Sequence, residues 1–118
     1  WYYNDYGRGH GYLNIAQAIQ KSCNYFFFEV SQRMGIEAIE KYARYFGLGS
    51  KTGIEIVGEN SGTLATREVA KQKGEVWSAA QTAYASIGQG FNTFTPLQMC
   101  KYTHRQLLQQ GRLDSLQR

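Results

Sequence analysis

Apolar residues recur at helical spacing in three segments of the first half of the chain. These segments span residues 15–20, 25–34 and 36–46. An amphipathic helix needs apolar side chains at intervals of three and four residues, and all three segments supply them. Asn14 precedes the first segment as a favourable N-cap, and Gly35 follows the second, where a helix commonly stops. The pattern therefore predicts three helices in succession, the first of them short.

The second predicted helix carries three consecutive phenylalanines, Phe26, Phe27 and Phe28. Three large aromatic side chains in a row cannot all lie on a solvated surface, so we expect at least two of them to be buried. This expectation places the helix over residues 25–34 at the centre of its domain, with the aromatic side chains in the core.

The hydrophobic pattern is weaker in the second half of the chain. Residues 53–57 alternate weakly and are predicted to form a short strand or an extended loop. Residues 58–66 are rich in turn-forming residues. Helices are predicted over residues 66–73, which Gly74 ends, and over the alanine-rich residues 78–87.

The clearest helix start lies near the C-terminal end. Thr95 is a favourable N-cap, Pro96 suits the first helical position, and Gln98 stands where a capping box requires it. This helix is predicted to run to about Gln109 and to stop at Gly111.

Composition and charge narrow the class of protein. The chain has 118 residues, of which 42% are hydrophobic, which suits one globular domain with a modest core. No apolar run reaches the roughly 20 residues that cross a bilayer, and no signal-peptide pattern opens the chain. The net charge is +4, but the basic residues are scattered, so the sequence does not support binding to nucleic acid.

The start of the chain and its two cysteines add further expectations. The chain opens on Trp1 without an initiator methionine, which leads us to expect a fragment or an excised domain, and residues 1–12 are predicted to be loop or edge strand. Cys23 and Cys100 lack the spacing of a metal site. A disulfide between them stays open but is not indicated, and Cys23 is expected to be a small buried side chain.

Candidate chemistry stands between the first two predicted helices, at Ser22 and Asn24. A hydroxyl and a carboxamide two residues apart can point at one spot, but both residue types also cap helices well. Ser-x-Asn occurs by chance in many proteins, so these residues alone favour capping. His10 lies between two glycines of the preceding loop, where a histidine is more often structural than catalytic.

Four further strings follow Ser-x-Asn in a fixed order. They are FGLGSKTGI at 46–54, GE at 58–59, IGQG at 87–90 and TPLQM at 95–99. In this order and spacing, over residues 7–103, the chain resembles the transpeptidase domain of class B penicillin-binding proteins, the elongation-type enzymes similar to penicillin-binding protein 2. A single string would be a weak signal, and the order of all five carries the resemblance.

The resemblance implies roles for individual residues. Ser22 would be the proton-relay hydroxyl, and Asn24 would be the amide that orients the acyl-donor peptide or the side chain of a β-lactam. Gly88, Gln89 and Gly90 resemble a structural loop of the family. No metal or cofactor is implied.

Two motifs of the family are not supplied by this chain. No serine is followed by lysine three positions on, so the Ser-x-x-Lys nucleophile motif is absent from the sequence. Lys51-Thr52-Gly53 has the letters of the family's Lys-Thr-Gly motif, but it precedes the IGQG and TPLQM strings, whereas the motif follows them in the family. We therefore interpret Lys51 as an exposed loop lysine.

The resemblance sets the overall expectation. The fold should be mainly α, a helical subdomain with four to five helices and little or no sheet. Residues 1–103 would form part of the transpeptidase domain. Residues 104–118, rich in Gln and Arg, do not match the family and are interpreted as an appended or out-of-frame tail.

The parent protein would be an enzyme that cross-links peptidoglycan through a serine acyl-enzyme, while this piece alone would be inactive. Its partners would be the peptidoglycan stem peptide, β-lactams and the rest of the transpeptidase domain, with no nucleic acid. It would be anchored in the bacterial cell membrane, with this domain outside the cytoplasm. Two alternatives stay open: a β-lactam sensor receptor or lactamase-like domain, which shares the motifs, and a non-catalytic helical interaction module.

Overall fold

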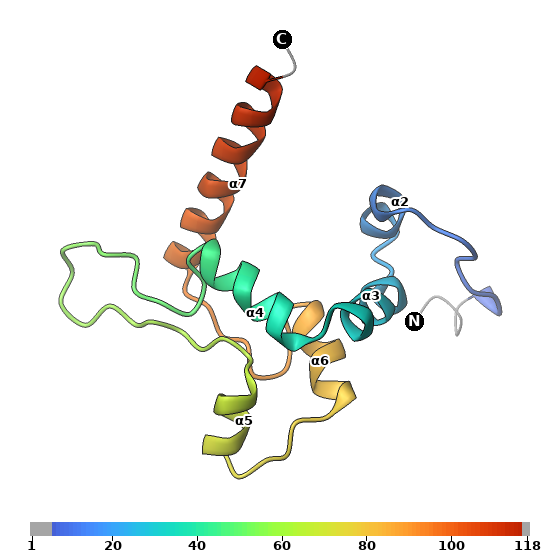
Figure 1. The fold of residues 1–118 in the computed structure, drawn as a ribbon, viewed down its shortest axis with the longest axis horizontal. Helices are drawn as coiled ribbons and strands as arrows, with labels where there is room; N and C mark the ends of the chain where they lie inside the picture. Colours follow the sequence, from blue (N-terminus) through green and yellow to red (C-terminus); the bar gives the residue numbers. More distant parts are fainter. Residues whose placement is uncertain (1–5, 117–118) are drawn as a thin grey trace.

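The computed structural model describes residues 6–116, and the side chains up to residue 112. Six helices follow one another along this part of the chain (Figure 1). They are α2 (Ile15–Gln20), α3 (Asn24–Met34), α4 (Ile36–Tyr45), α5 (Arg67–Gln72), α6 (Ala79–Ser86) and α7 (Pro96–Leu116). The loop or edge strand predicted at 1–12 falls partly on residues 1–5, which lie outside the described residues.

Polar side chains cap the starts of several helices, and Asn14 does so as the sequence predicted. Asn14 Oδ1 accepts a hydrogen bond from the Gln17 N–H at 2.9 Å, and Gln17 Oε1 accepts one from the Asn14 N–H at 3.0 Å. Ser78 and Gln81 form the same reciprocal capping box at the start of α6. Each box satisfies backbone donors that the first helical turn leaves without partners.

The end of α7 corrects one prediction. Gly111 does not stop the helix, which continues to Leu116. Glycine in an exposed helix interior costs only about 1 kcal/mol relative to alanine, so one glycine alone does not end a helix. The start of α3 also differs by one residue, because Asn24 rather than Tyr25 is its first helical position.

The fold is mainly α, as expected, and the described part of the chain holds the six helices given above rather than four to five. Within the described residues, the sheet content is one isolated bridge, in which Thr63 and Thr93 exchange backbone hydrogen bonds of 2.7 and 2.9 Å. Residues 53–57 form part of a long loop between α4 and α5 that projects from the body of the molecule (Figure 1). They are therefore an extended loop, which was one of the two predicted possibilities.

The core is small and lies where α3, α4 and α6 meet. Its buried residues are Ile36, Ala65 and Ala85, and Ile39, Trp77 and Phe91 pack against them. The radius of gyration is 16.6 Å, whereas a compact domain of this length would have about 13.5 Å. The molecule is therefore open, with α2, α7 and the long loop extending from the centre (Figure 1).

The three phenylalanines of α3 are only half-buried, which corrects the expectation that at least two would be fully buried. Phe28 contacts Tyr84 of α6 edge-on, with ring centroids 6.4 Å apart, while Phe26 and Phe27 contact each other at 5.4 Å. Full burial of rings on several sides of one helix needs neighbours on several sides. The described part of the chain supplies α6, α4 and, to a smaller extent, α2, and it leaves the remaining surface of α3 open.

Gln98 is the polar centre of the second half of the molecule. It is fully buried, and its Oε1 accepts the Thr95 N–H at 2.9 Å. Its Nε2 donates to the carbonyls of Ser50 and Ser61, at 2.8 and 2.6 Å. The Gln98 amide therefore caps α7 and holds both ends of the projecting loop. Without it, the backbone groups to which it bonds would be left without a hydrogen-bond partner.

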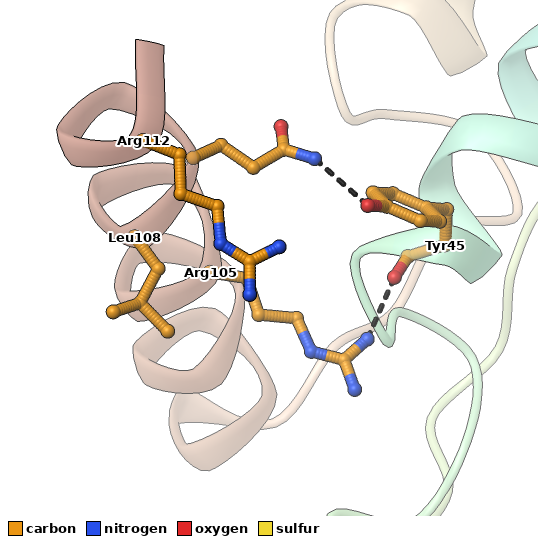
Figure 2. Close-up of a pocket in the computed structure, with 5 residues that line it drawn as sticks. Tyr45, Arg105, Leu108 and Arg112 are labelled. Carbon is orange, nitrogen blue, oxygen red and sulfur yellow. Dashed lines mark hydrogen bonds between the residues drawn. The ribbon is translucent and has the colours of Figure 1, made fainter. Parts of the chain in front are cut away.

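The middle of α7 is tied to the end of α4 (Figure 2). Arg105 donates from Nη1 to the Tyr45 carbonyl at 2.6 Å, and Gln109 donates from Nε2 to the Tyr45 hydroxyl at 2.9 Å. A cation at the last carbonyls of a helix also interacts favourably with the helix dipole. Residues 105–109 are thus in contact with the rest of the fold, although the sequence led us to interpret them as part of an appended or out-of-frame tail.

Candidate functional site

The junction between α2 and α3 is built on a left-handed residue. Ser22 has φ +48°, and among the described residues it is the only non-glycine with positive φ. The Ser22 N–H donates to the Ile19 carbonyl at 3.0 Å, and the Cys23 N–H donates to the Ala18 carbonyl at 2.9 Å. This pair of bonds is the Schellman motif that ends many helices, with Ser22 in the position that glycine usually occupies.

A serine in this position costs stability. The left-handed conformation brings Cβ close to the following carbonyl oxygen, at about 1–2 kcal/mol for a residue other than glycine. Glycine would form the same turn without that cost. Backbone strain of this kind concentrates at functional sites, where a particular side chain is needed in a particular place.

The side chains of the junction alternate between exposed and buried. Cys23 is 7% exposed, as predicted, whereas Ser22 and Asn24 are both exposed. Cys23 is the N-cap of α3 and makes no side-chain capping bond. Within the described residues, neither the Ser22 hydroxyl nor the Asn24 amide makes a side-chain hydrogen bond, so the alternative in which these side chains cap helices does not hold.

The junction therefore presents a hydroxyl and an amide to solvent. A serine hydroxyl donates one proton and accepts on its oxygen, so it can pass a proton between two groups. A carboxamide donates from its nitrogen and accepts on its oxygen, so it can hold a peptide group at both ends. Within the described residues no base is hydrogen-bonded to the Ser22 hydroxyl to activate it, so this geometry suits binding and proton relay better than attack on a carbonyl.

Lys51-Thr52-Gly53 lies in the projecting loop and is used structurally. The Glu59 carboxylate accepts from the Thr52 N–H and hydroxyl and, at 3.2 Å, from the Gly53 N–H. Lys101 of α7 donates from Nζ to the Thr52 carbonyl at 2.8 Å. Lys51 itself is exposed, as interpreted from the sequence.

Glu59 belongs to the GE string at 58–59, but its structural role was not predicted from the sequence. The hydrogen bond from the Thr52 hydroxyl, together with the bonds from backbone N–H groups, lowers the pKa of this carboxyl, because they stabilise its ionised form. The GE string marked this residue, but nothing local indicated that its carboxylate would bind Thr52 and Gly53, because many loops contain an acidic residue seven positions after a threonine by chance.

The remaining candidates lie apart from the junction in the chain. His10 is half-buried in the loop before α2, and Gly88-Gln89-Gly90 forms the exposed turn after α6, with φ of +75° and +73° at its two glycines. Cys23 and Cys100 are both free, and Cys100 is exposed on α7. In residues 6–116 we find no cluster of three potential metal ligands, and none of the helices there is long and apolar enough to cross a membrane.

A mainly helical unit with an exposed Ser-x-Asn junction is what the resemblance to penicillin-binding proteins led us to expect. The chain is a member of the penicillin-binding protein transpeptidase family, because the family model of the penicillin binding protein transpeptidase domain matches residues 1–115.

Curated relatives agree with this assignment. The peptidoglycan D,D-transpeptidase MrdA of Escherichia coli is 40% identical over 102 residues, which cover 84% of this chain and 16% of the relative. Stage V sporulation protein D of Bacillus subtilis is 39% identical over 90 residues, which cover 76% of this chain and 13% of the relative. The chain thus spans about one sixth of the length of the MrdA relatives it matches.

Solved structures show the same relationship in three dimensions. The chain is similar to penicillin-binding protein 2 of Pseudomonas aeruginosa, with a TM-score of 0.74 and 30% identity over 80% of this chain and 22% of that one. It is also similar to penicillin-binding protein 2 of Helicobacter pylori, solved in complex with MreC, with a TM-score of 0.70 and 33% identity. The latter match covers 76% of this chain and 17% of the other.

Proposed function

We propose that this chain supplies one wall of the acyl-transfer site of a peptidoglycan D,D-transpeptidase. Ser22 relays a proton, and Asn24 orients the acyl-donor stem peptide or a β-lactam. The observation that carries the proposal is the α2–α3 junction: an exposed serine held in a strained backbone conformation, followed by an exposed amide that makes no bond within the described chain. Family membership supplies the reaction class.

The reaction needs a serine nucleophile from outside this sequence. The nucleophile's oxygen attacks the carbonyl of the donor peptide or lactam, the C–N bond breaks, and an ester to the enzyme forms. The nucleophile's proton ends on the departing nitrogen. A hydroxyl that both accepts and donates, such as that of Ser22, can pass this proton, while the Asn24 amide holds the donor in register. No cofactor takes part in this proposal.

Exposed apolar surface supports the view that this unit packs against more protein. Ile15 and Ile19 of α2 are 65% and 63% exposed, and Tyr25 of α3 is 75% exposed. A groove of about 630 Å³ runs between α4, α6 and α7, with Met34, Ile39, Phe46 and Phe94 among its lining residues. Apolar surface on this scale marks an interaction site, and we assign it to the rest of the transpeptidase domain.

We extend the proposal to the parent protein and to the limits of the domain. Residues 1–103 are the part of the transpeptidase domain that carries the family's motifs; residues 104–118 carry none of them, although the family model extends to residue 115. The parent is anchored in the bacterial membrane with this domain outside the cytoplasm. The structural relative from H. pylori was solved in complex with MreC, and a protein similar to MreC is the partner we propose for the parent.

The test uses the full-length protein that carries this sequence and a fluorescent penicillin. Ser22→Ala and Asn24→Ala should each slow covalent labelling by 10-fold or more, because removal of a proton-relay or substrate-orienting group typically costs this much or more. The matched control is Ser61→Ala, since Ser61 is exposed and its hydroxyl makes only a 3.4 Å contact with the Gly62 carbonyl. Unchanged labelling of both site variants would overturn the assignment.

A second arm uses this sequence alone. It contains no Ser-x-x-Lys, so we expect neither covalent labelling by penicillin nor its hydrolysis. Labelling of the isolated sequence would show that the nucleophile lies within it and would contradict the proposal.

A further inference from the structure

The buried residue between the two proposed site residues has no chemical role in the proposed reaction. Cys23 is 7% exposed, and its N–H closes the Schellman motif on the Ala18 carbonyl at 2.9 Å. Ala18 is itself fully buried. In this motif the residue after the left-handed position commonly makes an apolar contact with the helix it terminates, and Cys23 and Ala18 occupy those two positions.

The turn needs such an anchor, because the backbone of Ser22, the residue before Cys23, is strained. Ser22 at φ +48° would relax to a negative φ if nothing held the residues on either side of it. The Ile19 and Ala18 carbonyls hold the two N–H groups, and burial of the Cys23 side chain keeps them in place. Strained conformations persist only where the surroundings over-determine them.

We propose that Cys23 is a positioning residue for Ser22 and Asn24: its buried side chain anchors the turn whose left-handed backbone presents the two polar groups to the substrate. The inference rests on the proposed function for its consequence, but the structural part of it can be tested separately. It also means that the backbone conformation at Ser22, and not the hydroxyl alone, makes the site.

The first experiment measures how often the turn opens, without reference to catalysis. In the full-length protein with Cys100 and any cysteine outside this sequence replaced by serine, Cys23 is the thiol that a reagent can modify. Ser22→Thr keeps a hydroxyl but adds a β-branch, which is strongly disfavoured at positive φ. We expect it to speed Cys23 modification by at least 10-fold, whereas Ser22→Gly, which fits the turn, should leave the rate equal or slower.

The control measures the modification rate of the other cysteine, Cys100. In the matching protein with Cys23 and the outside cysteines replaced by serine, exposed Cys100 should react quickly and at one rate in all Ser22 variants. If Ser22→Thr leaves Cys23 as protected as the native serine does, the turn is not held by its left-handed conformation and the inference is wrong.

The second experiment asks whether Cys23 acts on the reaction. Cys23→Asp places a carboxylate at a position that is only 7% exposed and should lower the first-order acylation rate of the full-length protein at saturating β-lactam by 10-fold or more, while Cys23→Ala stays within 3-fold of the native rate. Cys100→Asp, the same change at an exposed position, should alter nothing.

The readout separates positioning from simple folding. A merely structural role would reduce the fraction of molecules that acylate and leave the rate of the remainder unchanged, so a lower amplitude at the native rate would contradict the inference. If the native protein is not acylated at all, the proposed function fails, and the thiol experiment alone decides whether Cys23 anchors the turn.

Discussion

Gln98, at the start of α7, is fully buried, and its side-chain amide makes three hydrogen bonds. Ser22 and Asn24, at the α2–α3 junction, are exposed, and their side chains make none within the described residues. Both junctions join separate segments with polar side chains. The first uses its polar atoms to hold the fold together, whereas the second leaves them available and accepts a strained backbone to do so.

This contrast separates structural polar residues from candidate site residues without reference to any relative. A buried amide with every partner present can be removed only at the expense of stability. An exposed hydroxyl in a conformation that favours glycine can be removed with a gain in stability, so its presence needs another reason.

The largest effect is expected at Gly62, beside Gln98. Its φ is +63°, and an added Cβ would lie 2.5 Å from the Thr93 carbonyl oxygen and 2.7 Å from Gln98 Oε1. Gly62→Ala should therefore lower the free energy of unfolding by about 4 kcal/mol, from backbone strain and overpacking together. Urea denaturation measures it.

Gly58→Ala is the matched control for that substitution. Gly58 has φ +85°, but nothing lies within 4 Å of an added Cβ. Gly58→Ala should therefore lower the free energy of unfolding only through backbone strain, by about 1 kcal/mol. Equal losses at the two glycines would show that the region around Gln98 is not tightly packed.

The next effect is at Gln98 itself. Gln98→Ala removes the α7 capping bond and leaves the Ser50 and Ser61 carbonyls without their partner. We expect a loss of about 3 kcal/mol in the free energy of unfolding. Gln72→Ala, at an exposed position in α5, should change stability by no more than about 0.5 kcal/mol. A Gln98 variant as stable as the Gln72 variant would remove the contrast between the junctions.

A smaller effect of opposite sign is expected at Ser22. Ser22→Gly removes the strain at φ +48°, partly offset by the greater freedom of glycine in the unfolded chain, so a gain of about 0.5–1 kcal/mol is expected. Ser61→Gly, at an exposed position without positive φ, should instead lose stability. If Ser22→Gly destabilises the protein as much as Ser61→Gly does, the serine is not strained.

The smallest effect is local and depends on pH. The Thr52 hydroxyl and backbone N–H groups lower the pKa of Glu59, so this carboxylate stabilises the loop above the ordinary glutamate pKa of about 4.3 and loses that contribution as the pH falls through its depressed value. Amide exchange at Thr52 and Gly53 should accelerate in acid beyond its intrinsic pH dependence. Glu59→Gln should show fast exchange already at neutral pH, whereas Glu55→Gln on the same loop should behave as the native protein does. A native-like Glu59→Gln profile would contradict the assignment.

The sequence predicted the parts of this structure that local chemistry decides. Asn14 and Thr95 lie at helix starts as predicted, because a side-chain oxygen beside the first turn has few other partners to choose from. Gly111 misled the prediction, since a single glycine lowers helix stability only slightly.

Burial was harder to predict, because it depends on neighbours rather than on local pattern. Phe26, Phe27 and Phe28 are hydrophobic enough for a core, but the described chain offers α3 neighbours on part of its surface only. Ser22 and Asn24 were predicted as site residues because the Ser-x-Asn motif stands first in the ordered series of motifs. The left-handed conformation of Ser22 could not be predicted, because serine seldom adopts it and a glycine would have been the signal.

The most direct test of the central claim combines stability and chemistry in one variant, Ser22→Gly of the full-length protein. Rapid mixing with a fluorescent β-lactam measures its acylation rate, and thermal unfolding of the same sample measures its stability. We predict a protein at least as stable as the native one that acylates at least 10-fold more slowly, because the turn is kept and the hydroxyl is lost. Native-rate acylation by that variant would contradict the claim that Ser22 belongs to the acyl-transfer site.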